Sequence, residues 1–168
     1  WAPQWEQLEP LPLHERPERV YQWCLRAAKE GDDKEAVRLY ELLVAALQDA
    51  NSGQPALVQV AQEAMRLYRW LDDEERSRET AGRDRGEAAV VPSPSLFGLK
   101  RRLLTAVAFC WSDMNRDAQF DGMERFLADA GRTKDPDMSE ALAEALAAAV
   151  GGSQKAERAL PLMVELLV

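Results

Sequence analysis

A short segment in the second half of the chain is rich in side-chain oxygens, which are the ligands that calcium prefers. The residues that carry them lie between positions 113 and 124: Asp113, Asn115, Asp117, Asp121 and Glu124. A calcium ion takes about six to eight hard oxygen ligands, and one tight loop with this spacing supplies them. Residues 113–124 are therefore a candidate calcium site.

This segment resembles the calcium-binding loop of EF-hand proteins. The resemblance implies a ligand set of Asp113, Asn115, Asp117, the Gln119 carbonyl, Asp121 through a water molecule and Glu124 with both oxygens. The sequence departs from the EF-hand pattern at Ala118, where the sharp turn calls for glycine, and it offers no second loop as a partner. The alternative, which we favour, is a short polar turn between two helices in which Asp and Asn act as caps.

Other residues that could carry catalysis or bind a metal are few and widely separated. The single histidine is His14, and the two cysteines, Cys24 and Cys110, each fall in an apolar helical run. This spacing does not suit a zinc site or a Cys–His nucleophile. We interpret the cysteines as reduced core residues, which favours a reducing compartment: the cytoplasm, or an organelle interior after removal of a transit peptide.

The remaining carboxylate pairs do not predict an active site. Residues 32–33 and 72–73 are Asp–Asp pairs in expected turns, and general acid–base work needs a pKa shifted by burial. The sequence has no glycine-rich phosphate loop and no Gly-x-Ser-x-Gly elbow. We therefore expect a protein that is not an enzyme and holds no cofactor, with calcium as the alternative.

Composition and charge limit the partners. The chain has 168 residues, 46% of them hydrophobic, and a net charge of −8. An acidic balance argues against nucleic acid and anionic membranes, because phosphate contact needs clustered cations. We interpret the one basic cluster, Lys100–Arg102, as a solvated helix face; contact with a membrane surface or an acidic partner groove is the alternative. No apolar run is long enough to span a membrane, so we expect a soluble protein. The start at Trp1 suggests a processed or trimmed product.

Apolar spacing near 3.6 residues, with matched stop and cap signals, predicts an all-α protein built as an irregular antiparallel array of about six or seven helices. The expected helices span residues 18–30, 34–49, 56–71 or beyond, 95–112, 119–130, 137–150 with Asp137 as its cap, and a last one after 153 that Pro161 interrupts. The expected parts are an extended proline-rich arm (1–17), a first helical part (18–79), a flexible linker (80–95) and a second helical part (96–168).

The first two expected helices form the clearest unit. Gly31 can take the left-handed conformation that ends a helix. Asp32 can cap the next helix, with Glu35 as its capping-box partner. Ala36 and Tyr40 then lie on one face, small beside large, so a neighbouring helix can approach closely.

This unit resembles a tetratricopeptide repeat over roughly 30 residues. The resemblance places Val20, Trp23, Cys24 and Ala27 at the packing positions of the first helix. Poorer candidates follow at residues 117–126 and 138–160. Members of this class generally bind peptides or partner subunits on a concave face, and no binding residues can be carried over to this chain.

The two ends of the chain are unusually apolar, which suggests docking to partners. The residues concerned are Trp1, Trp5 and Leu8 at one end and Leu162, Leu166 and Val168 at the other. A contiguous exposed apolar patch usually marks an interface, although the first segment could also pack on its own body. The function predicted is therefore a non-enzymatic subunit of a larger assembly that docks proteins through helical faces and apolar ends.

Overall fold

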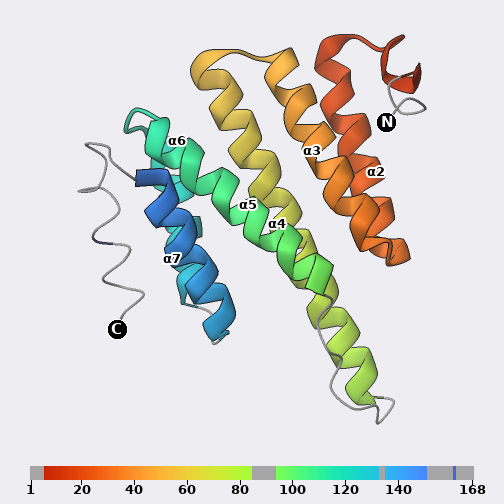
Figure 1. Cartoon of the computed structure of the whole chain (residues 1–168), viewed down its shortest axis with the longest axis vertical. Coiled ribbons are helices and arrows are strands. Elements are labelled where there is room, and N and C mark those ends of the chain that lie inside the picture. Colours follow the sequence, from red (N-terminus) through yellow and green to blue (C-terminus); the bar gives the residue numbers. More distant parts are fainter. Residues whose placement is uncertain (1–5, 85–93, 133–134, 151–160, 162–168) are drawn as a thin grey trace.

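The computed structural model describes residues 6–84, 94–132, 135–150 and residue 161, and all regular structure within these ranges is helical. The elements in chain order are the 3-10 turn η1 (Leu13–Glu15) and the α-helices α2 (Arg16–Glu30), α3 (Asp33–Ala50), α4 (Gly53–Asp84), α5 (Pro94–Asp113), α6 (Ala118–Gly131) and α7 (Pro136–Val150). No strand occurs in the described part of the chain. The predicted all-α class is confirmed (Figure 1).

Proline marks the starts of four of the six described α-helices. Pro17, Pro55, Pro94 and Pro136 each lie in the first turn of a helix, where the missing N–H has no intrahelical partner to lose. The expectation of an extended arm over residues 1–17 is wrong for residues 6–17, and residues 1–5 lie outside the described ranges. Residues 6–8 and 13–15 are helical and α2 already begins at Arg16.

Aspartates cap three of the described helices; Asp32 does so as the sequence predicts, and Asp117 agrees with the general expectation of an Asp or Asn cap in its turn. Asp32 accepts a hydrogen bond from the Glu35 backbone N–H, and Asp117 accepts one from that of Phe120. At α7 the cap is Asp135, which accepts from the Asp137 N–H at 3.0 Å, so the prediction of Asp137 is wrong. Pro136 starts the helix and so moves the cap to the residue before it.

The helices pack as neighbours in an antiparallel series, with α5 inside the array. Figure 1 shows α2, α3 and α4 side by side in alternating directions. Helix α3 contacts α2 as well as α4 and α5, which agrees with its predicted position between two layers. Helix α5 contacts α3, α4, α6 and α7. Helix α5 therefore packs between the earlier helices α3 and α4 and the later helices α6 and α7.

One hydrophobic core runs through the described residues. It includes Leu43 of α3, Leu67 of α4, Leu103 of α5 and Leu127 of α6. The predicted division into two helical parts is not seen, because both contribute to this core. The predicted linker is also too long: α4 continues to Asp84 and α5 begins at Pro94, while residues 85–93 lie outside the described ranges.

The expected last helix, after residue 153, lies outside the described residues except for Pro161, which is helical. In the described ranges, each helix falls short of the length or the hydropathy needed to cross a bilayer.

Candidate partner-binding groove

The turn between α2 and α3 is built by two complementary capping devices. Gly31 has φ of 81°, in the left-handed region that favours glycine. The Asp32 N–H bonds to the Ala27 carbonyl at 2.9 Å and the Gly31 N–H bonds to that of Ala28 at 3.2 Å, which together form a Schellman motif. Asp32 then caps α3 through the Glu35 N–H at 3.2 Å. The chain therefore reverses direction here with its backbone groups paired.

The second half of the predicted capping box does not form. Since the Asp32 N–H is already bonded to Ala27, the Glu35 carboxylate is left to pair with Arg38, which donates its Nε to Glu35 Oε2 at 2.7 Å. This hydrogen bond lowers the pKa of Glu35, and it raises the pKa of Arg38.

A groove of about 250 Å³ opens beside this turn. Its apolar lining consists of Trp23 and Ala27 from α2 and Leu39 from α3, and its polar lining consists of Gln7, Arg26, Glu30, Asp32 and Glu35. Ala27 and Leu39 are buried and Trp23 is half-buried. The accessible lining of the groove is therefore mostly polar, with Trp23 as its partly exposed apolar side chain.

Three chain segments position these side chains. Residues 23, 26, 27 and 30 follow the spacing of one face of a helix, so α2 presents Trp23, Arg26 and Glu30 together. Gln7 arrives from the segment before η1, which is held by Leu8, a fully buried residue of the core. Sequence reasoning placed Trp23 and Ala27 on packing positions but missed Arg26 and Glu30. The signal available was their shared face with Trp23.

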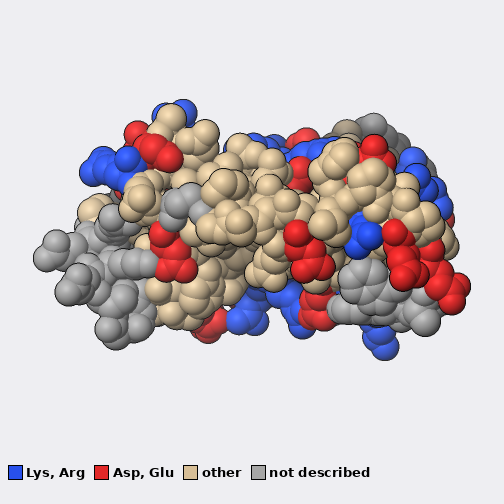
Figure 2. Space-filling model, turned by 90° about the horizontal axis from the view of Figure 1, so that it is seen from above, with Lys and Arg blue, Asp and Glu red and all other residues tan. Residues whose placement is uncertain are grey.

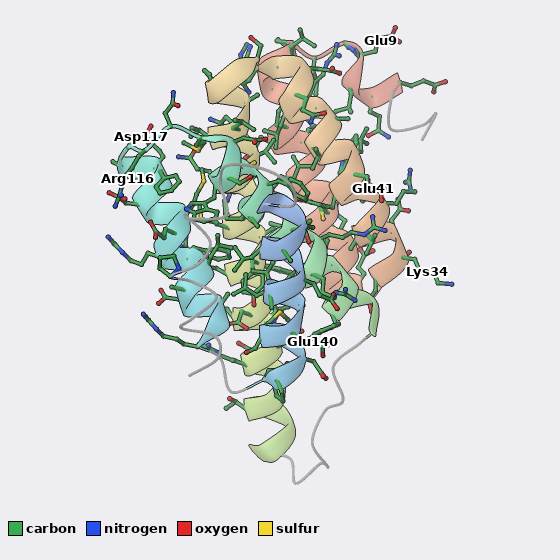
Figure 3. All side chains as sticks on the ribbon, turned by 60° about the vertical axis from the view of Figure 1, so that its left-hand side comes forward. Glu9, Lys34, Glu41, Arg116, Asp117 and Glu140 are labelled. Atoms are coloured by element: carbon green, nitrogen blue, oxygen red, sulfur yellow. The ribbon has the colours of Figure 1, made fainter. Side chains whose placement is uncertain are left out.

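The basic cluster on α5 is engaged by acidic residues of three other helices. Lys100 bonds to Glu75 (2.8 Å) and Asp72 (3.1 Å) of α4. Arg101 bonds to Glu144 of α7 (2.6 Å), and Arg102 pairs with Glu41, which Figure 3 labels on α3. The interpretation as a solvated face is wrong for Lys100, whose side chain is 6% exposed, because α4 brings two carboxylates over it.

The candidate calcium segment is divided between a turn and a helix. Asp113 ends α5 and Asn115 lies in the connection, while Asp117 caps α6 through Phe120 N–H at 2.9 Å. Figure 3 shows Arg116 and Asp117 together at the start of α6. Gln119, Asp121 and Glu124 all lie within α6.

This arrangement agrees with the short inter-helix turn rather than with a single loop over 113–124. A twelve-position loop would need the first two turns of α6 to rearrange. In the described ranges, no three side chains of His, Cys, Asp or Glu converge as a metal-binding group. Calcium binding at residues 113–124 stays a prediction.

Of the residues predicted to bind partners at the two ends of the chain, Leu8 is the one that the structure describes. Leu8 is fully buried in the core, so it packs on its own chain instead of offering a surface. Trp1, Trp5, Leu162, Leu166 and Val168 lie outside the described residues.

The cysteines are buried free thiols, as predicted. Cys24 donates a hydrogen bond from Sγ to the Ala36 carbonyl at 3.3 Å. Burial raises the pKa of Cys24 and of Cys110 to about 12. A thiol held neutral in this way is a poor nucleophile.

The charges on one end of the molecule do not form a basic surface. Figure 2 shows that uncharged side chains occupy much of the middle of this face and that acidic and basic groups are interspersed around them. A nucleic-acid interface would instead gather Lys and Arg in a patch or stripe.

The fold and the groove define an all-α protein with an open, charged recess on its first helix pair. Comparison with protein-family models, with curated proteins and with solved structures finds no match. The resemblance to tetratricopeptide repeats therefore rests on the residues of the α2–α3 pair alone. There, Ala36 and Tyr40 are both buried, and membership of that repeat class stays a prediction.

Proposed function

We propose that this protein is a non-enzymatic subunit or adaptor that docks protein partners through its helical faces, with the groove beside the α2–α3 turn as a principal docking site. The observation that supports this proposal is the lining of the groove. A half-buried tryptophan lies among buried apolar residues, and exposed charged groups surround it. Tryptophan and arginine are enriched among the residues that contribute most to protein–protein binding.

The size of the groove favours a protein partner over a small molecule. Small-molecule sites typically enclose roughly 300–1,000 Å³ and bury most of their ligand. At about 250 Å³ the groove is smaller and open to solvent. It has room for one or two side chains that project from a partner.

The rigidity of the surrounding structure also favours docking. The turn is closed by the Schellman motif and by the Asp32 cap, and Leu8 anchors the segment that carries Gln7. A preformed surface loses less conformational entropy on binding than one that must first be ordered.

The test is a comparison of two charge reversals in the full chain. Arg26→Glu changes the groove, and Arg125→Glu makes the same change at an exposed position of α6 that does not line the groove. Each tagged variant is used to capture proteins from a lysate of the source organism, and circular dichroism checks that the fold is intact. We expect Arg26→Glu to change the recovery of a specific partner by about tenfold or more, because it reverses a charge in the lining of the groove.

Arg125→Glu should recover that partner at the wild-type level. If both variants and the wild-type chain recover the same proteins in the same amounts, the groove is not a docking site and the proposal fails.

A further inference from the structure

The lining of the groove has more acidic than basic residues, and the two kinds lie at different places along it. Of its lining residues, Glu30, Asp32 and Glu35 are acidic and Arg26 is basic. The three acidic residues lie at or just beside the α2–α3 turn, whereas Arg26 lies one helical turn earlier on α2. The groove therefore has an acidic end.

The partners of these acidic groups differ. The Glu35 carboxylate is paired with Arg38, so its charge is largely neutralised. Asp32 is exposed and accepts a hydrogen bond from the Glu35 N–H through Oδ1. Glu30 is exposed on the last turn of α2. Glu30 and Asp32 are thus the groups that would meet an incoming charge.

The apolar lining of the groove adds a second requirement. Trp23 offers apolar surface next to these carboxylates, whereas Ala27 and Leu39 are buried. An apolar side chain seated there removes hydrophobic area from water, and the face of an indole also attracts a cation.

We propose that the groove binds a partner segment in which Lys or Arg stands next to a large apolar side chain. The apolar group lies on Trp23, and the cation faces Glu30 and Asp32. This inference rests on the proposed function and specifies its partner class. An acidic segment would be repelled by the carboxylates of Glu30 and Asp32. Arg26 is the one cation in the lining that could attract it, so binding of an acidic segment is disfavoured.

The inference is tested with three labelled peptides and the full chain. They share one sequence with a central Leu, flanked by two Lys, two Glu or two Gln, and binding is followed by fluorescence anisotropy. We expect the Lys peptide to bind about tenfold more tightly than the Glu peptide at low ionic strength. The difference should shrink as salt is added, because the charges are solvent-accessible and screened.

Charge-neutral substitutions identify the groove as the site. Glu30→Gln with Asp32→Asn removes both charges and keeps the helix cap, since Asn caps as well as Asp. This double variant should bind the Lys peptide about five- to tenfold more weakly, and Arg26→Gln should bind it more tightly. The control, Asp49→Asn with Glu140→Gln, removes two exposed charges that do not line the groove and should change nothing.

Equal binding of the three peptides, or no effect of the Glu30/Asp32 double variant, overturns the inference. The proposed function can survive that result, because Arg26→Glu would still change partner recovery if the groove binds a segment of another chemistry. If no peptide binds and Arg26→Glu also leaves partner recovery unchanged, both fail together.

Discussion

At the scale of single residues, the chain contains one buried polar group whose cost is easily measured. The Tyr40 hydroxyl is buried and has no hydrogen-bond partner among the residues that the structure describes. Burial also raises the pKa of Tyr40, so the phenol stays neutral in the folded state. Leaving a buried hydroxyl without a partner costs about 1–3 kcal/mol relative to its hydrated state in the unfolded chain.

Tyr40→Phe should therefore keep or raise the stability of the protein. We expect the free energy of unfolding to change by between zero and about +1 kcal/mol, because the ring packing is kept and the unsatisfied group is removed. Urea unfolding of both proteins at one pH measures this change, with Tyr40→Ala as a control that should lose about 3–5 kcal/mol. A loss above about 1 kcal/mol in Tyr40→Phe would show that the hydroxyl has a partner, such as a buried water.

At the scale of the helices, much of the fold is local and could be read from the sequence. Gly31, Asp32 and Asp117 act at the helix ends where they were expected, because their capping bonds join residues that are at most five apart. The burial of Lys100 could not be read in this way. Its partners, Asp72 and Glu75, are 28 and 25 residues away in sequence.

The groove shows the same limit. The charged face of α2 is visible in the sequence, but its recess exists only because Gln7 and the turn into α3 meet beside that face. The position of Gln7 depends on where Leu8 packs in the core. The local sequence pattern does not predict that packing position.

The Lys100 ion pairs predict a large effect at the α4–α5 contact. Lys100→Met removes the buried cation that Asp72 and Glu75 share, although Asp72 keeps its ion pair with Arg76. We expect a loss of about 2–3 kcal/mol in the free energy of unfolding. Arg101→Met breaks an exposed pair with Glu144 and should lose less than about 1 kcal/mol. Urea unfolding at neutral pH compares them. Equal small losses would contradict a buried ion pair at Lys100.

The ion pairs of Lys100 also predict how the stability of the protein depends on pH. Burial lowers the pKa of Lys100, but its hydrogen bonds and ion pairs with Glu75 and Asp72 outweigh burial and leave the pKa raised. Because the pKa is higher in the folded state, the stabilisation is fully present below the unfolded value of about 10.4 and is lost as pH rises through the folded value. The difference between wild type and Lys100→Met should be constant from about pH 7 to 9 and shrink above about 10.4.

At the scale of the whole molecule, the single core predicts cooperative unfolding. Trp23 on α2 and Trp111 on α5 pack against or within the same cluster. Urea unfolding curves from far-ultraviolet circular dichroism and from tryptophan fluorescence should therefore coincide, as for a two-state domain. Two separate transitions would show that the helices before and after residues 85–93 unfold independently.

The central position of α5 also has a consequence for how the protein is made. Synthesis proceeds from the amino terminus, and the early part of a chain can begin to fold before the rest exists. Helices α2 and α3 can pair as soon as they emerge, since their contact needs only the turn at Gly31. The surfaces of α3 and α4 that α5 covers have no cover until residues 94–113 have left the ribosome. During that interval the nascent chain exposes apolar surface that α5 later covers, so we expect it to aggregate if translation stops before α5.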